Sequence, residues 1–118
     1  MQRIPNVSRD DVLRVIRRDF PAADADEVLA LLDRYGTESR ELGRARVQLA
    51  VLKLAGGSVP EVARQVEAAK RDYRDVLAEA EYPENLTAVL RPGPVGVEEQ
   101  RSMDDRDWEQ YRIWLERR

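Results

Sequence analysis

The segment KRDYRD, residues 70–75, contains the residue types best suited to chemistry. Asp72 could act with Asp75 or Glu79 as a carboxylate pair, either in acid–base catalysis or in binding a hard cation. Both uses need a pocket that shifts a pKa, whereas helical spacing puts these carboxylates on an outward face. We therefore expect no catalytic residue, no metal site and no cofactor.

The composition removes several kinds of chemistry. The 118 residues include no histidine and no cysteine. Imidazole and thiol catalysis, disulfides and the common zinc sites are therefore excluded. The sequence GGS at 56–58 precedes a helical pattern, but it lacks the strand and the lysine of a phosphate-binding loop. The sequence thus predicts a protein that is not an enzyme.

The charge balance bears on the kind of partner. The chain has 20 basic and 23 acidic side chains and a net charge of −3. A mildly acidic protein does not attract polyanions, so the overall charge disfavours nucleic acid. No apolar run reaches the length of a membrane span, and the N-terminal residues lack the layout of a signal peptide. We expect a single cytoplasmic domain, residues 1–118, that does not bind membranes.

Helical patterns account for most of the chain, because apolar residues recur at three- and four-residue spacing over four segments. Three of these segments open with a short polar residue followed three positions later by an acid, the spacing of a capping box. The sequence therefore predicts an all-α fold with two successive helical hairpins in residues 8–83. The four helices are expected at about 8–20, 24–35, 37–55 and 58–82.

The third and fourth helices are expected to form the core. The third has two apolar stripes and belongs in the middle of the domain, and Gly43 either admits a close neighbour or marks a later helix start. The fourth has one apolar stripe centred on Tyr73, and no Gly or Pro interrupts residues 61–82, so we expect one unbroken helix. The residues expected on its solvent side are Arg71, Asp72, Asp75 and Glu79, of which Arg71 and Asp75 are spaced to form an ion pair.

The last part of the chain differs from the rest in composition. Pro and Gly cluster within residues 91–97, so we expect an irregular connection over 84–101 and a C-terminal helix over 102–118. On this helix Trp108 lies on a different face from Ile113 and Trp114. If the helix is only partly covered, Ile113 and Trp114 form an exposed apolar patch of the kind found at dimer and partner interfaces. If it is wedged between other helices, both tryptophans are buried.

Three blocks, RVQLAVLKLAGG, AAKRDYRDVLAEAEYP and DWEQYRIWLERR, follow one another over most of the chain. In these blocks the chain resembles a group of small uncharacterised bacterial proteins. The resemblance implies a soluble, all-helical protein without an assigned activity, and it implies no functional residue.

These observations favour a small non-catalytic protein–protein interaction module. It would act as a homodimer or beside a larger partner, for example as an immunity or accessory protein. The alternative is a helix-turn-helix DNA-binding protein that uses residues 61–77, although no turn residue stands at 67–69, where the turn should fall. The candidate interaction residues are Arg71, Asp72, Asp75, Glu79, Ile113 and Trp114.

Overall fold

The computed structural model describes residues 3–118; residues 1 and 2, which the expected domain 1–118 includes, lie outside the described part. Helix makes up 72% of the structure and no strand occurs among residues 3–118, so the all-α prediction is confirmed. The elements are α1 (Arg9–Asp19), the 3-10 turn η1 (Ala22–Asp24), α2 (Ala25–Leu32), α3 (Arg44–Ala55), α4 (Val59–Glu81), α5 (Pro83–Ala88) and α6 (Val97–Glu116).

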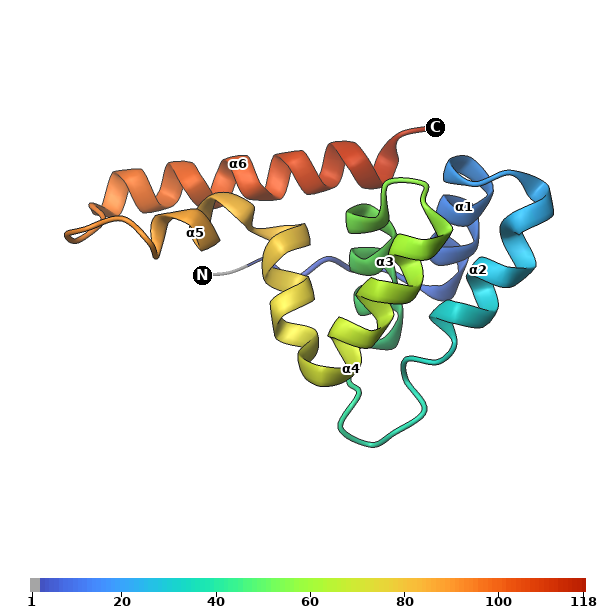
Figure 1. Cartoon of the computed structure of the whole chain (residues 1–118). Helices are drawn as coiled ribbons and strands as arrows, with labels where there is room; N and C mark the ends of the chain where they lie inside the picture. Colours follow the sequence, from blue (N-terminus) through green and yellow to red (C-terminus); the bar gives the residue numbers. More distant parts are fainter. Residues whose placement is uncertain (1–2) are drawn as a thin grey trace.

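Helices α1 to α4 form the body of the molecule, with α3 between α1 and α4 (Figure 1). Helix α3 packs most extensively against α4, and all six residues 47–52 of α3 are fully buried. The long α6 lies across the body, and α5 runs beside its first half, so that the two project together from one side (Figure 1). We call residues 83–106, which comprise α5, the loop and the first half of α6, the arm.

Two of the predicted helix starts are made by the expected caps. The Asp11 carboxylate accepts the Ser8 N–H at 3.0 Å at the start of α1, and Ser58 Oγ accepts the Glu61 N–H at 3.3 Å at the start of α4. Helix α3 starts at Arg44 rather than near residue 37, because Gly43 at its N-cap has a φ of +61°. Of the two interpretations of Gly43, the later helix start is therefore the one found.

Helix α4 is broken in the middle, so the prediction of one unbroken helix over 61–82 is wrong. Asp72 has extended backbone angles, φ −160° and ψ 102°, and its Oδ1 accepts the Arg74 N–H at 3.1 Å. Asp72 thus acts as the N-cap of the second half of α4. The break leaves Tyr73 half-buried at the edge of the core instead of at its centre. The spacing of Asp72 and Asp75 is that of a helix start, and this was the available signal.

The loop between α2 and α3 is organised by a buried carboxylate. Glu41 is 6% exposed, and its Oε1 accepts the N–H groups of Gly36, Thr37 and Glu38 at 2.9, 3.1 and 3.4 Å. Its Oε2 accepts a hydrogen bond from Lys70 Nζ at 2.7 Å. Burial alone would raise the pKa of Glu41, but the hydrogen bonds from Lys70 and the loop backbone lower it to about 2.

We expect the fold to lose the stabilisation that Glu41 provides when the pH falls. Because its pKa is depressed from 4.5 to about 2, its contribution is complete above pH 4.5 and is lost as the pH falls towards 2. A depression of this size corresponds to about 3 kcal/mol at neutral pH. Urea unfolding at near-neutral pH and near pH 3 measures the free energy of unfolding at each pH. The decrease in this free energy between the two pH values should be smaller in Glu41→Gln than in the parent. An equal loss would contradict this role, and Glu38→Gln, an exposed neighbour, is the control.

The region expected to be an irregular connection, 84–101, is largely helical. It contains most of α5 and the first turn of α6, and only residues 89–96 lie between the two helices. Helix α6 therefore begins at Val97 and not at 102. Gly96 is its N-cap, and Glu98 and Glu99 in the first turn favour the positive end of the helix dipole. Hydrogen bonds from the backbone of α5 to a side chain of α6 hold the start of α5 in helical form.

Candidate functional site

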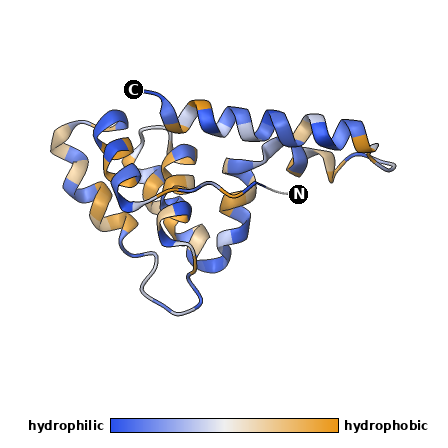
Figure 2. Cartoon of the chain, turned by 180° about the vertical axis from the view of Figure 1, so that it is seen from behind, coloured by the Kyte–Doolittle hydropathy of each residue, from blue (hydrophilic) through white to orange (hydrophobic). Residues whose placement is uncertain are grey.

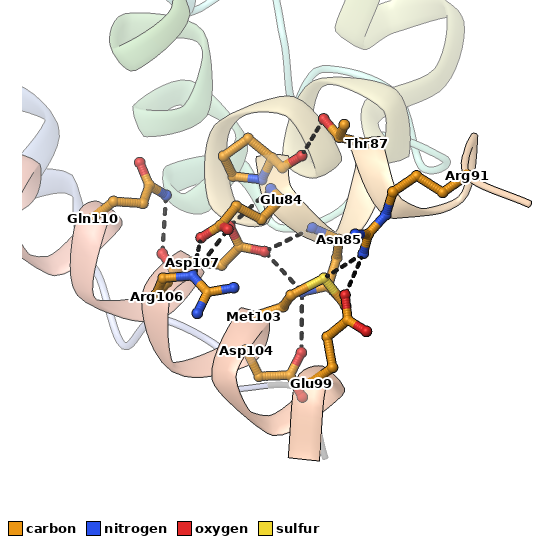
Figure 3. A network of polar contacts seen from close by, with 11 residues as sticks. Glu84, Asn85, Thr87, Arg91, Glu99, Met103, Asp104, Arg106, Asp107 and Gln110 are labelled. Atoms are coloured by element: carbon orange, nitrogen blue, oxygen red, sulfur yellow. Dashed lines mark hydrogen bonds and ion pairs between the residues drawn. The ribbon is translucent and has the colours of Figure 1, made fainter. Parts of the chain in front are cut away.

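The arm depends on one buried carboxylate, Asp107 of α6, which is only 2% exposed (Figure 3). Its Oδ1 accepts the Glu84 N–H at 2.9 Å, and its Oδ2 accepts the Asn85 N–H at 3.1 Å and the Asn85 side-chain amide at 2.7 Å. These are the first free N–H groups of α5, so Asp107 caps α5 from another helix. A helix as short as α5 is not stable alone, so this cap holds the arm together.

Further polar contacts join the two sides of the arm (Figure 3). Arg106 pairs with Glu84 at 2.8 Å, and Arg91 pairs with Glu99 at 2.8 Å. The Asn85 side chain also donates to Asp104 Oδ1 at 3.0 Å. Arg91 and Arg106 are thus each neutralised by an acid of the arm itself.

The root of the arm is fixed to the body by a buried ion pair. Arg46 of α3 donates two hydrogen bonds to Glu81 at the end of α4, the one from Nε at 2.7 Å. The Glu81 side chain is 5% exposed and the Arg46 side chain 25%. The pair holds the end of α4, and therefore the point from which the arm leaves, against the centre of the body.

The other end of α6 is held by Arg18 of α1. Its Nη1 donates to the carbonyl oxygens of Trp114 and Arg117 at 2.7 and 2.8 Å, and its guanidinium lies 5.2 Å from the centre of the Trp114 ring. A cation at the last carbonyls of a helix stabilises the negative end of its dipole. Arg18 therefore fixes the C-terminal turn of α6 to the body.

The expected exposed patch of Ile113 and Trp114 is not present in that form. Ile113 is 51% exposed, but Trp114 is only 9% exposed and packs beside the fully covered Tyr111. The buried stripe of α6 runs through Met103, Asp107, Tyr111 and Trp114. The sequence left open whether Trp114 is exposed or buried; the structure buries Trp114 and leaves Trp108 half-buried, so neither expected arrangement holds in full.

The four candidate residues on α4 lie near the break in that helix. Arg71, Asp75 and Glu79 are exposed and Asp72 is half-buried; Arg71 and Asp72 line the same hollow of about 230 Å³. No hydrogen bond or ion pair links members of this set within residues 3–118. The expected Arg71–Asp75 ion pair is missing because the helix breaks between the two residues.

The same region bears on the DNA-binding alternative. The break in α4 falls at Asp72 and not at 67–69, where a helix-turn-helix would turn. Lys70 is held by Glu41 and by the Arg34 carbonyl, and Arg74 is paired with Asp72 at 2.9 Å. Lys70 and Arg74, two cations of the segment 61–77 that would face DNA, are thus held by acids of the chain itself.

The end of the arm carries an apolar surface that the sequence interpretation missed. Four of the seven exposed large apolar side chains in the described part of the chain gather there, and we call them the tip surface: Leu86, Val89, Leu90 and Val97, which are 42%, 80%, 85% and 78% exposed. Figure 2 shows hydrophobic residues at this end, away from the body. Leu86 and Val89 of this set line a hollow of about 390 Å³. The spacing of Leu86, Val89 and Leu90 is that of one helix face and was the available signal, although α5 itself ends at Ala88.

Within residues 3–118 there is no group of three or more metal-binding side chains, and none of the helices there has both the length and the apolar character to cross a bilayer. No family model, no curated protein and no solved structure matches the chain.

Proposed function

We propose that the protein is a small, non-catalytic interaction module that works through the tip surface, and that the occupant of this surface is a second copy of the chain. The observation that supports this proposal is the gathering of exposed Leu and Val side chains on a projecting arm. Single exposed apolar residues are ordinary, but a contiguous exposed patch is typical of an interaction site. Asp107 and Arg46 hold this patch away from the body, where it cannot be covered by the chain itself.

The charges beside the tip surface favour a second copy. In the Arg91–Glu99 and Arg106–Glu84 ion pairs each charge is balanced within one arm, so these four side chains would not repel their counterparts in a second copy. A twofold axis through the tip would place the same four side chains opposite one another, as an isologous dimer requires.

The size of the surface sets the expected affinity. Complete burial of a Val or Leu side chain contributes about 1.5–3 kcal/mol, while association costs about 4–15 kcal/mol. Eight partly exposed side chains from two copies give a gain of the same order as this cost. We therefore expect a weak dimer that dissociates on dilution.

The molar mass across a dilution series tests the proposal. Light scattering or sedimentation equilibrium should give a mass that falls from twice 13.6 kDa towards 13.6 kDa on dilution. The double variant Val89→Glu/Leu90→Glu should be a monomer throughout, whereas Leu42→Glu, a control at an exposed leucine outside the arm, should still dimerise.

Three results would overturn the second-copy proposal. A parent chain that is a monomer at every concentration would leave the tip surface for a different, larger partner, the arrangement expected of an immunity or accessory protein. A double variant that still dimerises would place the interface outside the arm. Loss of the dimer in Leu42→Glu alone would place it on the body.

A further inference from the structure

Helix α4 bends within a segment that has no helix-breaking residue. Asp72 has non-helical backbone angles, φ −160° and ψ 102°, although no Gly or Pro occurs in residues 61–82. The two halves of the helix therefore run in different directions, and the second half turns towards α6 (Figure 1). No residue of this segment excludes a continuous helix, so the sequence permits a straight α4 as well as a bent one.

Each half of α4 is anchored to the rest of the body separately. Lys70, near the end of the first half, donates to Glu41 at 2.7 Å and to the Arg34 carbonyl oxygen at 2.9 Å. Glu81, at the end of the second half, pairs with Arg46 of α3. The bend is therefore held by contacts with other elements on both sides of the break.

The apolar pattern of α4 fits a straight helix. At helical spacing the apolar residues of the two halves fall on one continuous stripe with Tyr73 at its middle, whereas Tyr73 is only half-buried in the bent helix. Straightening would complete the backbone hydrogen bonds of the helix and remove the Asp72 cap and the Asp72–Arg74 ion pair, which is mostly exposed and contributes little. The stripe comprises Val62, Val66, Ala69, Tyr73, Val76, Leu77 and Ala80.

A straight α4 is not compatible with a single copy, because it carries residues 73–118 away from the body. We call residues 73–118 the C-terminal unit and residues 3–71 the N-terminal unit. Exposing the core side chains of the C-terminal unit costs more than the regained helical hydrogen bonds return. A second copy offers the same contacts, so an exchange between two copies compensates this cost. The core side chains concerned are Val76, Leu77, Ala80, Tyr111 and Trp114.

We propose that two copies of the chain exchange their C-terminal units through a straightened α4. The first half of α4 in one copy then continues into a second half that packs on the N-terminal unit of the other copy. The contacts between the two units are made between copies, including Arg46 with Glu81 and Arg18 with the Trp114 carbonyl oxygen. Exchange of an identical element is a low-cost route to a dimer. Because the exchanged contacts lie in the core, this dimer does not depend on the tip surface and does not separate without unfolding.

Two charge-reversal variants of the full-length chain test the exchange. Arg46→Glu and Glu81→Arg each place like charges at the buried ion pair, so neither variant has a balanced pair alone. In an exchanged heterodimer, and only there, each N-terminal unit meets a C-terminal unit of opposite charge at this position. After the two variants are unfolded in urea and refolded as an equal mixture, native mass spectrometry should show a heterodimer of twice 13.6 kDa. It should exceed either homodimer about tenfold or more.

The tip-surface dimer is separated from the exchanged dimer by dilution and by a second pair of changes. The heterodimer should persist on dilution, and it should also form when both variants carry Val89→Glu/Leu90→Glu. A mixture that gives no heterodimer would overturn the exchange. A heterodimer that dissociates on dilution, or that is lost with Val89→Glu/Leu90→Glu, would also overturn it.

Changes at the break sharpen the test in the same Val89→Glu/Leu90→Glu background. Asp72→Ala should raise the association constant of the exchanged dimer about tenfold or more, because each copy loses a cap of the bent helix and gains a better helix former in the straight one. Tyr73→Pro should abolish exchange, since Pro fits the first turn after the extended Asp72 but not a continuous helix. Tyr73→Ala, which removes the same ring and permits both forms, is the control. Equal amounts of exchanged dimer in Tyr73→Pro and Tyr73→Ala would contradict a straightened α4.

Discussion

Replacement of Glu81 with alanine is expected to lower the free energy of unfolding by about 3–5 kcal/mol, the usual cost of breaking a buried ion pair. The loss is large because Arg46 would remain three-quarters covered, with no acid to balance its charge. Urea denaturation measures it directly. The matched control is Glu79→Ala, an exposed acid on the same helix, which should change stability by less than about 0.5 kcal/mol.

A double variant tests whether the loss of stability in Glu81→Ala comes from the unbalanced charge of Arg46. If the cost of Glu81→Ala comes from the unbalanced charge of Arg46, then Arg46→Met/Glu81→Met should be clearly more stable than Glu81→Ala, because apolar residues replace both charges. A Glu81→Ala protein as stable as Glu79→Ala would show that this pair does not hold the root of the arm.

Replacement of Asp107 with alanine is expected to unfold the arm while leaving the body folded. The change leaves the N–H groups of Glu84 and Asn85 without partners, at about 1–3 kcal/mol each. Because α5 is too short to be stable alone, the loss of structure should be concentrated in α5. Hydrogen exchange should show lost protection in α5 and retained protection in α3.

The control for this change is Asp105→Ala, which removes an exposed carboxylate from the same helix. Asp107→Ala should also abolish dimerisation, since it disorders the surface that carries Leu86, Val89 and Leu90. Amides of α5 that stay protected in Asp107→Ala would contradict the capping role. A fully unfolded protein would show that the arm and the body form one cooperative unit.

The parts of the fold that could be predicted are those set by neighbours in the sequence. The caps at Ser8 and Ser58 use an acid three residues away, and the two apolar stripes of α3 place it in the centre. The break at Asp72 was also local, but its acid pair with Asp75 was interpreted as an outer face.

The parts that could not be predicted depend on buried polar side chains with distant partners. Asp107 caps a helix that lies more than twenty residues earlier, and Gln48 in the fully buried part of α3 donates to the Leu32 carbonyl at 2.9 Å. Both residues look like surface residues in a hydrophobic pattern. Because Asp107 was not recognised as a buried cap, neither the helix α5 nor the start of α6 at Val97 was predicted, and the tip surface was missed as a consequence.

The most direct test of the tip-surface dimer is a distance between two copies. The chain has no cysteine, so one spin label can be placed at Thr87→Cys, exposed on the arm beside the tip surface, or at Ala30→Cys, exposed on α2 at the far side of the body (Figure 1). Pulsed EPR at dimer-forming concentration should give a Thr87–Thr87 distance shorter than the 47 Å length of one molecule, and a longer Ala30–Ala30 distance. No coupling between Thr87 labels, or Ala30 labels closer than those at Thr87, would contradict the proposed dimer.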